Sequence, residues 1–598
     1  MDGLFVFDGS NDLILDKLNN EIKEKLLELA QKQGLLQETS NIGDIDNNVM
    51  MQIFSPLITS QKIMFCQFDN SYSSIQCEKN FTIVLEDYLG YLFIKAGSEN
   101  LDFLQKSLKI FISCVKHVCG PNVHLLKADI ERRVLVNNLY DCWFDLYLTK
   151  QSFLVEAVEQ LLVNAEVKAK AFQGLRHMEK LKEEYQKSHG LIFVNDKLLT
   201  LYSSTQAQVL SAADLIFLNI FAHTVMKSDA SSNAIHSSLL FLEGVSKDKQ
   251  SGCIPNIVHV TNIFENIVLV LLIEHPNLGI TNNLFDVFFA VQKNRNNQSQ
   301  GDVENIKQSY ETMDLHIRSV QESFKKLKSN NTDLEENIKV FGVKWDIMKK
   351  SYLEYFKTKS RNALLKIESN LPKINDSLKE LFSLVTFQSS NTSLGIAQTT
   401  EISHIVQECL ASFQEFITVK STTNFSIASY LEEFPGLVHF IHVDRSANRH
   451  RVTAPNIEIT ADDNVINLRR KVWSMVEFSR QYLDKGHLNM MWKDVAFNYT
   501  YFMWFEDQNG MPVKPKSIPN LSLVSVKPQF NVGLLAGDYY ERFIEACFPK
   551  TNPNKIKCYE LYCVHLGLVT SLVVLEHCRR LAATINDIVG TKKSFDLL

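Results

Sequence analysis

The run Leu4-Phe5-Val6-Phe7-Asp8-Gly9-Ser10-Asn11-Asp12-Leu13-Ile14-Leu15 places two short apolar segments on either side of an Asp-Gly turn. Aromatic and β-branched side chains favour extended backbone, and Asp-Gly between two such segments is a strong hairpin signal. The run therefore predicts a β-hairpin. An acid stands on each side of the first segment and no basic residue precedes it, so we do not expect a signal peptide.

The same pattern returns near residue 190. Two apolar segments, Leu191–Val194 and Leu198–Tyr202, flank an Asn195-Asp196 turn. The sequence Ser211-Ala212-Ala213-Asp214 then predicts a helix start, because an acid in the first turn is stabilised by the helix dipole. Further strands are expected at 239–242, 257–260 and 267–273. The repeat predicts that one architecture occurs twice.

Around the first hairpin, the apolar pattern predicts a sheet with covering helices. Strand-like runs occupy 63–68, 81–85 and 91–94. Helical spacing follows at Leu101, Leu104, Leu108, Phe111, Ile112 and Val115, and again at Leu154, Val158, Leu161 and Leu162. This order of strands and helices is typical of an α+β fold, in which an antiparallel sheet is flanked by helices.

A helical region without strand signals extends from about 300 to 420. Lys/Glu-rich helices are expected at 319–327 and 345–367, and the Asn/Ser/Gln-rich segments 294–301 and 388–393 are expected to be flexible connectors. The apolar spacing is too irregular to predict a long coiled coil.

From about 420 onward the alternation of strands and helices resumes. We expect a hairpin from 437–443 and 452–454, a helix over 467–485, a strand-rich run over 497–506, and amphipathic helices over 539–547 and 560–583. The predicted organisation is three similar α+β domains at 1–185, 188–295 and 421–598, joined by a helical segment at 300–420.

The composition narrows the function classes. A net charge of -6 over 598 residues is mild, and Lys and Arg occur as short pairs such as Arg132-Arg133, Arg469-Arg470 and Arg579-Arg580, so we expect no nucleic-acid partner. The eleven cysteines are scattered, with no C-x-x-C and no His at finger spacing, which disfavours disulfide frameworks and zinc sites. The longest apolar runs are too short to span a bilayer, so we expect a cytoplasmic protein.

The sequence contains no phosphate-binding glycine loop, no nucleophile elbow and no zinc-protease motif. His439 and His442 are expected on opposite faces of a strand, where they cannot share a metal. Cys563 with His565, and His577 with Cys578, are expected on one amphipathic helix without further ligands. We therefore expect no catalytic residues, no metal and no cofactor. An enzyme with dispersed catalytic groups is the remaining alternative, and it predicts a deep polar pocket.

One long run carries a resemblance to a known family. Residues 425–445, from Phe425-Ser426-Ile427-Ala428-Ser429-Tyr430 through Phe434-Pro435-Gly436 to Val443-Asp444-Arg445, resemble the Hermansky-Pudlak syndrome 1 protein family. Segments around residues 473, 504 and 537–540 resemble it in the same order. The matching positions, which we interpret as structural, are Tyr430, Phe434, Pro435, Gly436, Asp444, Trp473, Trp504, Gly537 and Tyr539.

The resemblance implies three longin-type domains and a function. Such proteins pair with a Hermansky-Pudlak syndrome 4-type longin subunit, in the manner of the Mon and Ccz pair. The heterodimer is a guanine nucleotide exchange factor for Rab GTPases in biogenesis of lysosome-related organelles such as the pigment granule. The resemblance further implies that the protein is cytoplasmic and is recruited peripherally to endosomal and lysosome-related membranes. It also implies that the chain catalyses no bond-making reaction of its own. The alternative is a trafficking adaptor or tether whose longin domains only bind partners.

The candidate partner or GTPase surface lies in the first domain, where the resemblance is weakest. It comprises Met51, Phe54, Leu57 and Ile58, because longin pairs commonly join through this helix and the strand after it. The alternative is that these four side chains cover their own sheet. The linker after Val225 is much shorter than the Ser/Pro/Gly-rich insert of vertebrate relatives, so regulation carried by that insert is not transferred to this chain by the resemblance.

Overall fold

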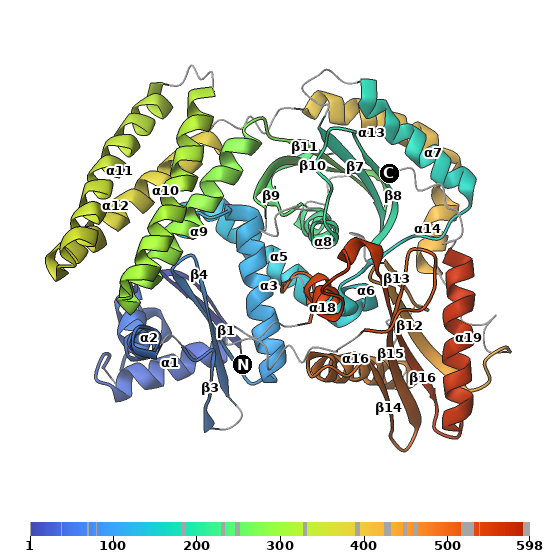
Figure 1. Cartoon of the computed structure of the whole chain (residues 1–598). Helices are drawn as coiled ribbons and strands as arrows, with labels where there is room; N and C mark the ends of the chain where they lie inside the picture. The colour runs from blue at the N-terminus through green and yellow to red at the C-terminus, as the bar shows by residue number, and fades with distance from the viewer. Residues whose placement is uncertain are drawn as a thin grey trace.

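The computed structural model describes most of the chain. The described residues are 2–37, 39–68, 71–78, 81–180, 187–228, 234–244, 252–326, 332–388, 395–423, 432–446, 451–455, 457, 463–515, 532–537 and 539–589. They form three mainly antiparallel sheets surrounded by helices, as Figure 1 shows. The predicted α+β architecture is confirmed.

The first domain contains a sheet in the order β2-β1-β5-β4-β3. Its elements are β1 (Asp2–Phe7), β2 (Leu13–Leu18), α1 (Asn20–Lys32), α2 (Asn47–Phe68), β3 (Ser74–Gln76), β4 (Thr82–Tyr88), β5 (Tyr91–Gly97), α3 (Leu101–Cys119), α4 (Leu125–Ala128) and α5 (Ile130–Thr149). The opening hairpin forms as predicted, and the Asp8 carboxylate accepts hydrogen bonds from the Ser10 and Asp12 amides at 2.8 and 2.9 Å. Phe5 and Phe7 face α1 and α2, while Leu4 and Val6 face α3.

The second domain repeats this plan, with the sheet order β8-β7-β11-β10-β9. Its elements are β7 (Ser188–Val194), β8 (Lys197–Ser203), α8 (Ala212–Ser228), β9 (His236–Leu242), β10 (Ile254–Phe264), β11 (Ile267–Glu274) and α9 (Leu278–Gln300). α8 covers one face of this sheet, and α7 (Ala165–Arg176) with α13 (Ile396–Leu410) covers the other. Every strand predicted in this domain is present.

The connector and third domain complete the chain. The connector comprises α10 (Val303–Lys326), α11 (Thr332–Thr358), α12 (Arg361–Val385), α13 and α14 (Gln414–Thr422). The third domain comprises β12 (Leu437–Asp444), β13 (Arg451–Thr453), α16 (Asp463–Asp484), β14 (Asn489–Lys493), β15 (Phe497–Glu506), α18 (Tyr539–Cys547), β16 (Lys557–Leu566) and α19 (Ser571–Val589). Its sheet order is β14-β15-β16-β12-β13-β6.

A short linker strand joins the second and third sheets. β6 (Val158–Glu159), which follows α6 (Gln151–Val155), pairs in parallel with β13. The next residues continue toward β8, where the Leu161 amide donates to the Leu198 carbonyl at 2.9 Å. Lys197 and Glu159 form an ion pair of 2.9 Å beside this junction. Because backbone hydrogen bonds tie the linker to both sheets, the two domains form one body.

The largest apolar core lies between the domains rather than within one of them. Figure 1 places α3, α5 and α8 between the three sheets, and their buried side chains belong to one cluster with those of α16, β15 and β16. Trp143 on α5 is a fully buried member of this cluster. Since this cluster draws residues from all three domains, apolar burial stabilises their relative arrangement as well as each fold.

Three predictions of local structure are wrong. Residues 63–68 are the last part of the helix α2, not a strand. At 154–162 no helix covers a sheet, because α6 ends at Val155, Glu156 takes a left-handed φ of 49°, and the chain becomes β6. Residues 560–583 divide into the buried strand β16 and the helix α19. Short apolar runs without clear periodicity do not separate a buried strand from a helix.

The connector differs from expectation in two places. The segment 294–301 is mostly the end of α9, where the buried Asn294 and Gln298 side chains hydrogen-bond the Tyr352 hydroxyl. The expected helix 345–367 is broken at Lys359, whose φ is 51°, and α12 begins after the Ser360 cap. Most of 388–393 lies outside the described residues.

Candidate protein-interaction site

Within the residues that the structure describes, no three His, Cys, Asp or Glu side chains gather as metal ligands. His439 and His442 lie on opposite faces of β12, as expected: His439 contacts Gln151 at 2.7 Å, whereas His442 stacks on Tyr559. Burial lowers the pKa of His439 to about 3 and that of His442 to about 4. Both are neutral, structural side chains.

The His and Cys residues near the C-terminus are arranged differently from prediction. Cys563 and His565 belong to β16, while His577 and Cys578 belong to α19, so the four do not share one helix. The imidazole rings of His565 and His577 stack with centroids 5.5 Å apart. They lie between the sheet and its covering helix, where burial lowers the pKa of His565 to about 4. These four side chains pack β16 against α19.

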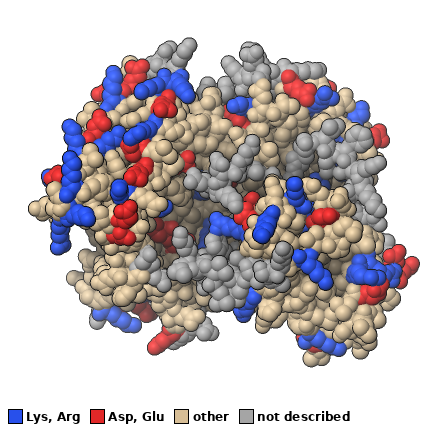
Figure 2. Space-filling view, in the orientation of Figure 1, with Lys and Arg blue, Asp and Glu red and all other residues tan. Residues whose placement is uncertain are grey.

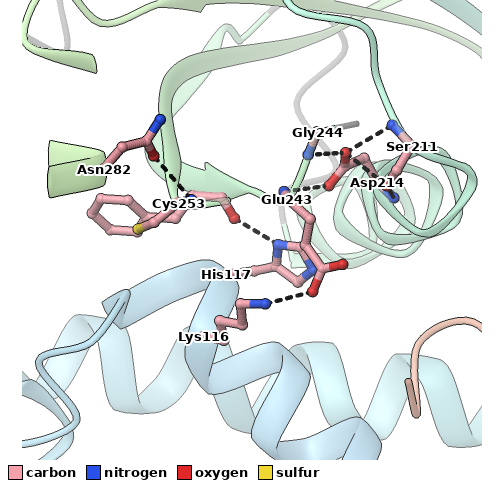
Figure 3. Close-up of polar contacts among 9 residues, drawn as sticks. Lys116, His117, Ser211, Asp214, Glu243, Gly244, Cys253 and Asn282 are labelled. Atoms are coloured by element: carbon pink, nitrogen blue, oxygen red, sulfur yellow. Dashed lines mark hydrogen bonds and ion pairs between the residues drawn. The ribbon is translucent and has the colours of Figure 1, made fainter. Parts of the chain in front are cut away.

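Polar contacts fix the first domain against the second, as Figure 3 shows. On α3, Lys116 forms an ion pair of 2.6 Å with Glu243, and His117 contacts the Phe241 carbonyl at 2.6 Å. Asp214 caps α8 through Ser211 and also accepts the amides of Glu243 and Gly244 at 2.8 and 2.9 Å. Asp214, which marks the start of α8 in the sequence, therefore also fixes the position of Glu243 and Gly244 after β9.

A buried charge network joins the first and third domains. Arg445, at the end of β12, donates to Glu560 at 2.6 Å, to the Val155 and Glu156 carbonyls at 2.7 and 2.9 Å, and to the Tyr540 hydroxyl at 2.9 Å. Both charged groups of the Arg445–Glu560 pair have 0% exposure. The guanidinium thus caps the last carbonyls of α6 while neutralising a buried acid.

A second buried acid extends this network. Glu156 pairs with Lys106 of α3 at 2.7 Å and accepts the amides of Leu534 and Leu535. Burial, followed by the nearby Arg480 cation, lowers the pKa of Lys106 to about 8. The Glu156 carboxylate therefore binds both α3 and residues 534–535, which are distant in sequence. These contacts indicate that the first domain is held in a fixed position on the other two.

A carboxyl group at the crossing of α3 and α16 predicts a pH-dependent stability. Burial, together with the neighbouring Asp102 carboxylate, raises the pKa of Asp484 to about 7, and Lys109 and Arg480 oppose this rise. A raised pKa means that the folded state holds a proton that the unfolded state releases near pH ~4. Stability therefore falls as pH rises from about 4 toward about 7, and then levels off.

We expect Asp484→Asn to remove this contribution. The stability advantage of the variant over the native chain should grow between pH 5 and pH 7.5 by on the order of 1 kcal/mol, a discounted value because the carboxyl is not fully buried. Thermal unfolding midpoints measured across this range test it. Asp376→Asn, at a carboxyl with 71% exposure, is the matched control. A difference between native and variant that stays constant with pH would contradict the prediction.

The apolar face of α2 continues beyond the sheet that it covers. Its first part is buried, with the Phe54 ring 4.5 Å from that of Phe5. In the last turns the side chains of Ile63, Met64 and Phe68 are 48%, 37% and 64% exposed. Met64 and Phe68 follow Leu57 at helical spacing, so the inward face of the helix is left uncovered there. We call Ile63, Met64 and Phe68 the α2 overhang.

The structure divides the four candidate residues of the sequence analysis. Phe54 and Ile58 are buried against the sheet, with 7% and 1% exposure, and are not part of the molecular surface. Met51 and Leu57 are half-buried. The sequence pattern predicts a strand at 63–68 and therefore does not identify the overhang residues; the helical spacing of Leu57, Met64 and Phe68 is the signal that points to them.

The family-motif positions serve structural contacts where they are described. Phe434 is buried beside His577, Gly436 has a φ of 82° at the turn into β12, and the Asp444 carboxylate accepts the Ser446 amide. The remaining contacts are those of Trp473 with the Tyr147 carbonyl, Trp504 with Glu506 and Tyr559, and Tyr539 with the Leu483 carbonyl. Pro435 is exposed, Gly537 has a φ of 126°, and Tyr430 lies outside the described residues.

Comparison with known families agrees with this architecture. Residues 2–146 match the first longin domain of FUZ, MON1 and HPS1, residues 186–290 match the second, and residues 436–588 match the third. The sheets, their flanking helices and the three matches define a longin-domain protein. The chain belongs to the FUZ, MON1 and HPS1 family, whose longin domains imply a role in membrane trafficking.

Among the described residues, no helix combines the length and the apolar character needed to cross a bilayer.

Proposed function

We propose that this chain is one subunit of a heterodimeric guanine nucleotide exchange factor for Rab GTPases of lysosomes and lysosome-related organelles, and that it acts without bond-making chemistry, as the Hermansky-Pudlak syndrome 1 resemblance suggests. The observation that carries the proposal is the α2 overhang. It is an exposed apolar surface on a domain that the ion pairs of Lys106 and Lys116 hold against the rest of the molecule. Exposed apolar side chains grouped on one element are typical of protein-binding surfaces.

The partner would be a second longin subunit of the Hermansky-Pudlak syndrome 4 type. The edge of the first sheet supports this assignment: β3 is three residues long and, among the residues that the structure describes, pairs only with β4. An unpaired strand edge is a template for addition of a strand from another chain. The edge strand β3 follows α2 directly in the chain, so a partner strand there would adjoin the overhang region.

The mechanism is differential affinity rather than bond chemistry. An exchange factor accelerates nucleotide release by binding the GTPase more tightly when its nucleotide is absent. Magnesium and nucleotide belong to the Rab, and the two subunits hold the switch segments of the Rab in a geometry that weakens both contacts. This mechanism is favoured when the first domain has a fixed orientation on the rest of the chain, because binding energy would otherwise be lost in reorienting that domain.

Affinity for the different nucleotide states of a Rab tests the proposal. The purified heterodimer should bind a lysosome-related Rab without nucleotide at least ~10-fold more tightly than the same Rab with GDP or GTP, a coupling of about 1.4 kcal/mol. An adaptor or tether would instead prefer the GTP form. Titration with nucleotide-free, GDP-loaded and GTP-loaded Rab separates these two functions, and a preference for the GTP form would exclude exchange activity.

A further inference from the structure

Within the connector, the turn between α11 and α12 forms a basic hairpin tip that the proposed exchange function does not use. Between Lys349 and Lys366, at the end of α11 and the start of α12, the sequence contains six basic residues and one acid, Glu354. The basic residues are Lys349, Lys350, Lys357, Lys359, Arg361 and Lys366. Figure 2 shows Lys and Arg side chains along the left edge of the molecule, where Figure 1 places this hairpin.

Most of these charges are available for an external anion. Lys349 pairs with Asp314, and Lys366 pairs with Glu354, at 3.3 and 3.0 Å. Lys350, Lys357, Lys359 and Arg361 are exposed and form no ion pair with any residue that the structure describes. Their mutual repulsion is unfavourable for the isolated chain, so a negatively charged surface would stabilise this end of the hairpin.

The tip is a defined structure that carries apolar side chains among its cations. Lys359 has a φ of 51°, its amide donates to the Tyr355 carbonyl at 2.7 Å, and Ser360 caps α12. Leu353 and Leu365 are 54% and 51% exposed. Leu353 lies three residues after Lys350 and four before Lys357, a spacing that places them on one side of α11.

We propose that the end of the α11–α12 hairpin binds anionic membranes, with its cations on phospholipid headgroups and Leu353 and Leu365 at the edge of the acyl region. Unpaired cations interleaved with exposed leucines fit this surface better than they fit nucleic acid, because phosphate contacts make no use of the leucines. The hairpin protrudes on the side of the molecule where Figure 1 shows α1 and α2. Membrane attachment there is independent of exchange activity.

Vesicle binding by the full chain tests the site. The chain should bind phosphatidylcholine vesicles that contain phosphatidylserine and should not bind pure phosphatidylcholine. The triple variant Lys350→Ala, Lys357→Ala, Arg361→Ala should lower the partition coefficient by about 100-fold, since each cation near an anionic surface contributes a factor of about 5. The control triple variant Lys493→Ala, Lys550→Ala, Lys555→Ala removes the same charge from exposed positions of the third domain. It should change binding by less than ~3-fold, because those cations lie away from the site.

A second variant addresses the leucines. Leu353→Asn with Leu365→Asn keeps the charge and should lower binding by at least ~10-fold, because apolar insertion is lost while the helix is retained. Equal binding of the hairpin and control triple variants, or binding that does not require anionic lipid, would overturn the proposal. Tighter binding to duplex DNA or to an acidic polypeptide than to the vesicles, unaffected by the leucine variant, would overturn it as well.

Discussion

Replacing Arg445 by Met is expected to lower the free energy of unfolding by about 3–5 kcal/mol, the usual cost of leaving one partner of a buried ion pair without the other. The Glu560 carboxylate would then be buried with only the hydroxyls of Tyr501 and Tyr562, at 2.9 and 3.2 Å. The carbonyls of Val155 and Glu156 would also lose their donors. Denaturant unfolding of the full chain, followed by tryptophan fluorescence, measures the change.

Two comparisons identify the cause of this loss. Arg579→Met removes a cation whose pair with Glu576 spans 3.5 Å at the surface and should cost less than ~1 kcal/mol. The double variant Arg445→Met, Glu560→Gln removes both buried charges and should recover part of the loss, because the unpaired acid is no longer present. If the double variant were less stable than Arg445→Met, the buried charge would not be the cause.

The second large effect is expected at the α2 overhang. Met64→Glu with Phe68→Glu places two charges on an apolar contact surface, where each desolvated charge costs several kcal/mol. GDP release stimulated by the heterodimer should fall by at least ~100-fold, equivalent to about 2.7 kcal/mol of lost binding. The thermal unfolding midpoint should stay within ~2 °C, because both side chains are exposed in the free chain. Initial rates of release measured with matched protein concentrations test this.

Leu315→Glu is the matched control for that variant. Leu315 is an exposed apolar residue on α10, with 67% exposure, and it lies outside the first domain. It should leave GDP release unchanged. A similar loss in the control, or full activity in the overhang variant, would remove α2 from the GTPase or partner surface.

Local sequence signals predicted much of the fold. The hairpins at 4–15 and 191–202 depend on turn residues and apolar segments that adjoin in the chain, and both form as expected. The helix after Ser211 is fixed by a cap within four residues. These elements could be predicted because the interactions that define them are local.

Elements defined by long-range packing could not be predicted in this way. β16 is buried on both faces, so its run from Lys557 to Leu566 lacks alternation, and Glu560 in its middle reads as a solvated position. The counter-charge for that buried acid comes from Arg445, 115 residues earlier in the chain. Similarly, the sequence predicts a strand at 63–68, within α2, because a short apolar run with Phe65 and Phe68 also fits extended backbone.

The four candidate residues Met51, Phe54, Leu57 and Ile58 lie on α2, whereas the exposed apolar residues of that helix are Ile63, Met64 and Phe68. Apolar residues at helical spacing identify a face, yet only the position of the sheet decides which of them are covered. Phe54 and Ile58 lie over the sheet, whereas Met64 and Phe68 lie beyond it. The basic hairpin tip was missed for a related reason, since a break at Lys359 brings two helix ends together.

Release of labelled GDP from a lysosome-related Rab tests the central claim most directly. The chain purified with its longin partner should accelerate release by at least ~10³-fold over the intrinsic rate, as expected for a factor that lowers nucleotide affinity by about 4 kcal/mol in the ternary complex. Neither subunit alone should match it. Release at the intrinsic rate from every such Rab, in the presence of a folded heterodimer, would contradict the account.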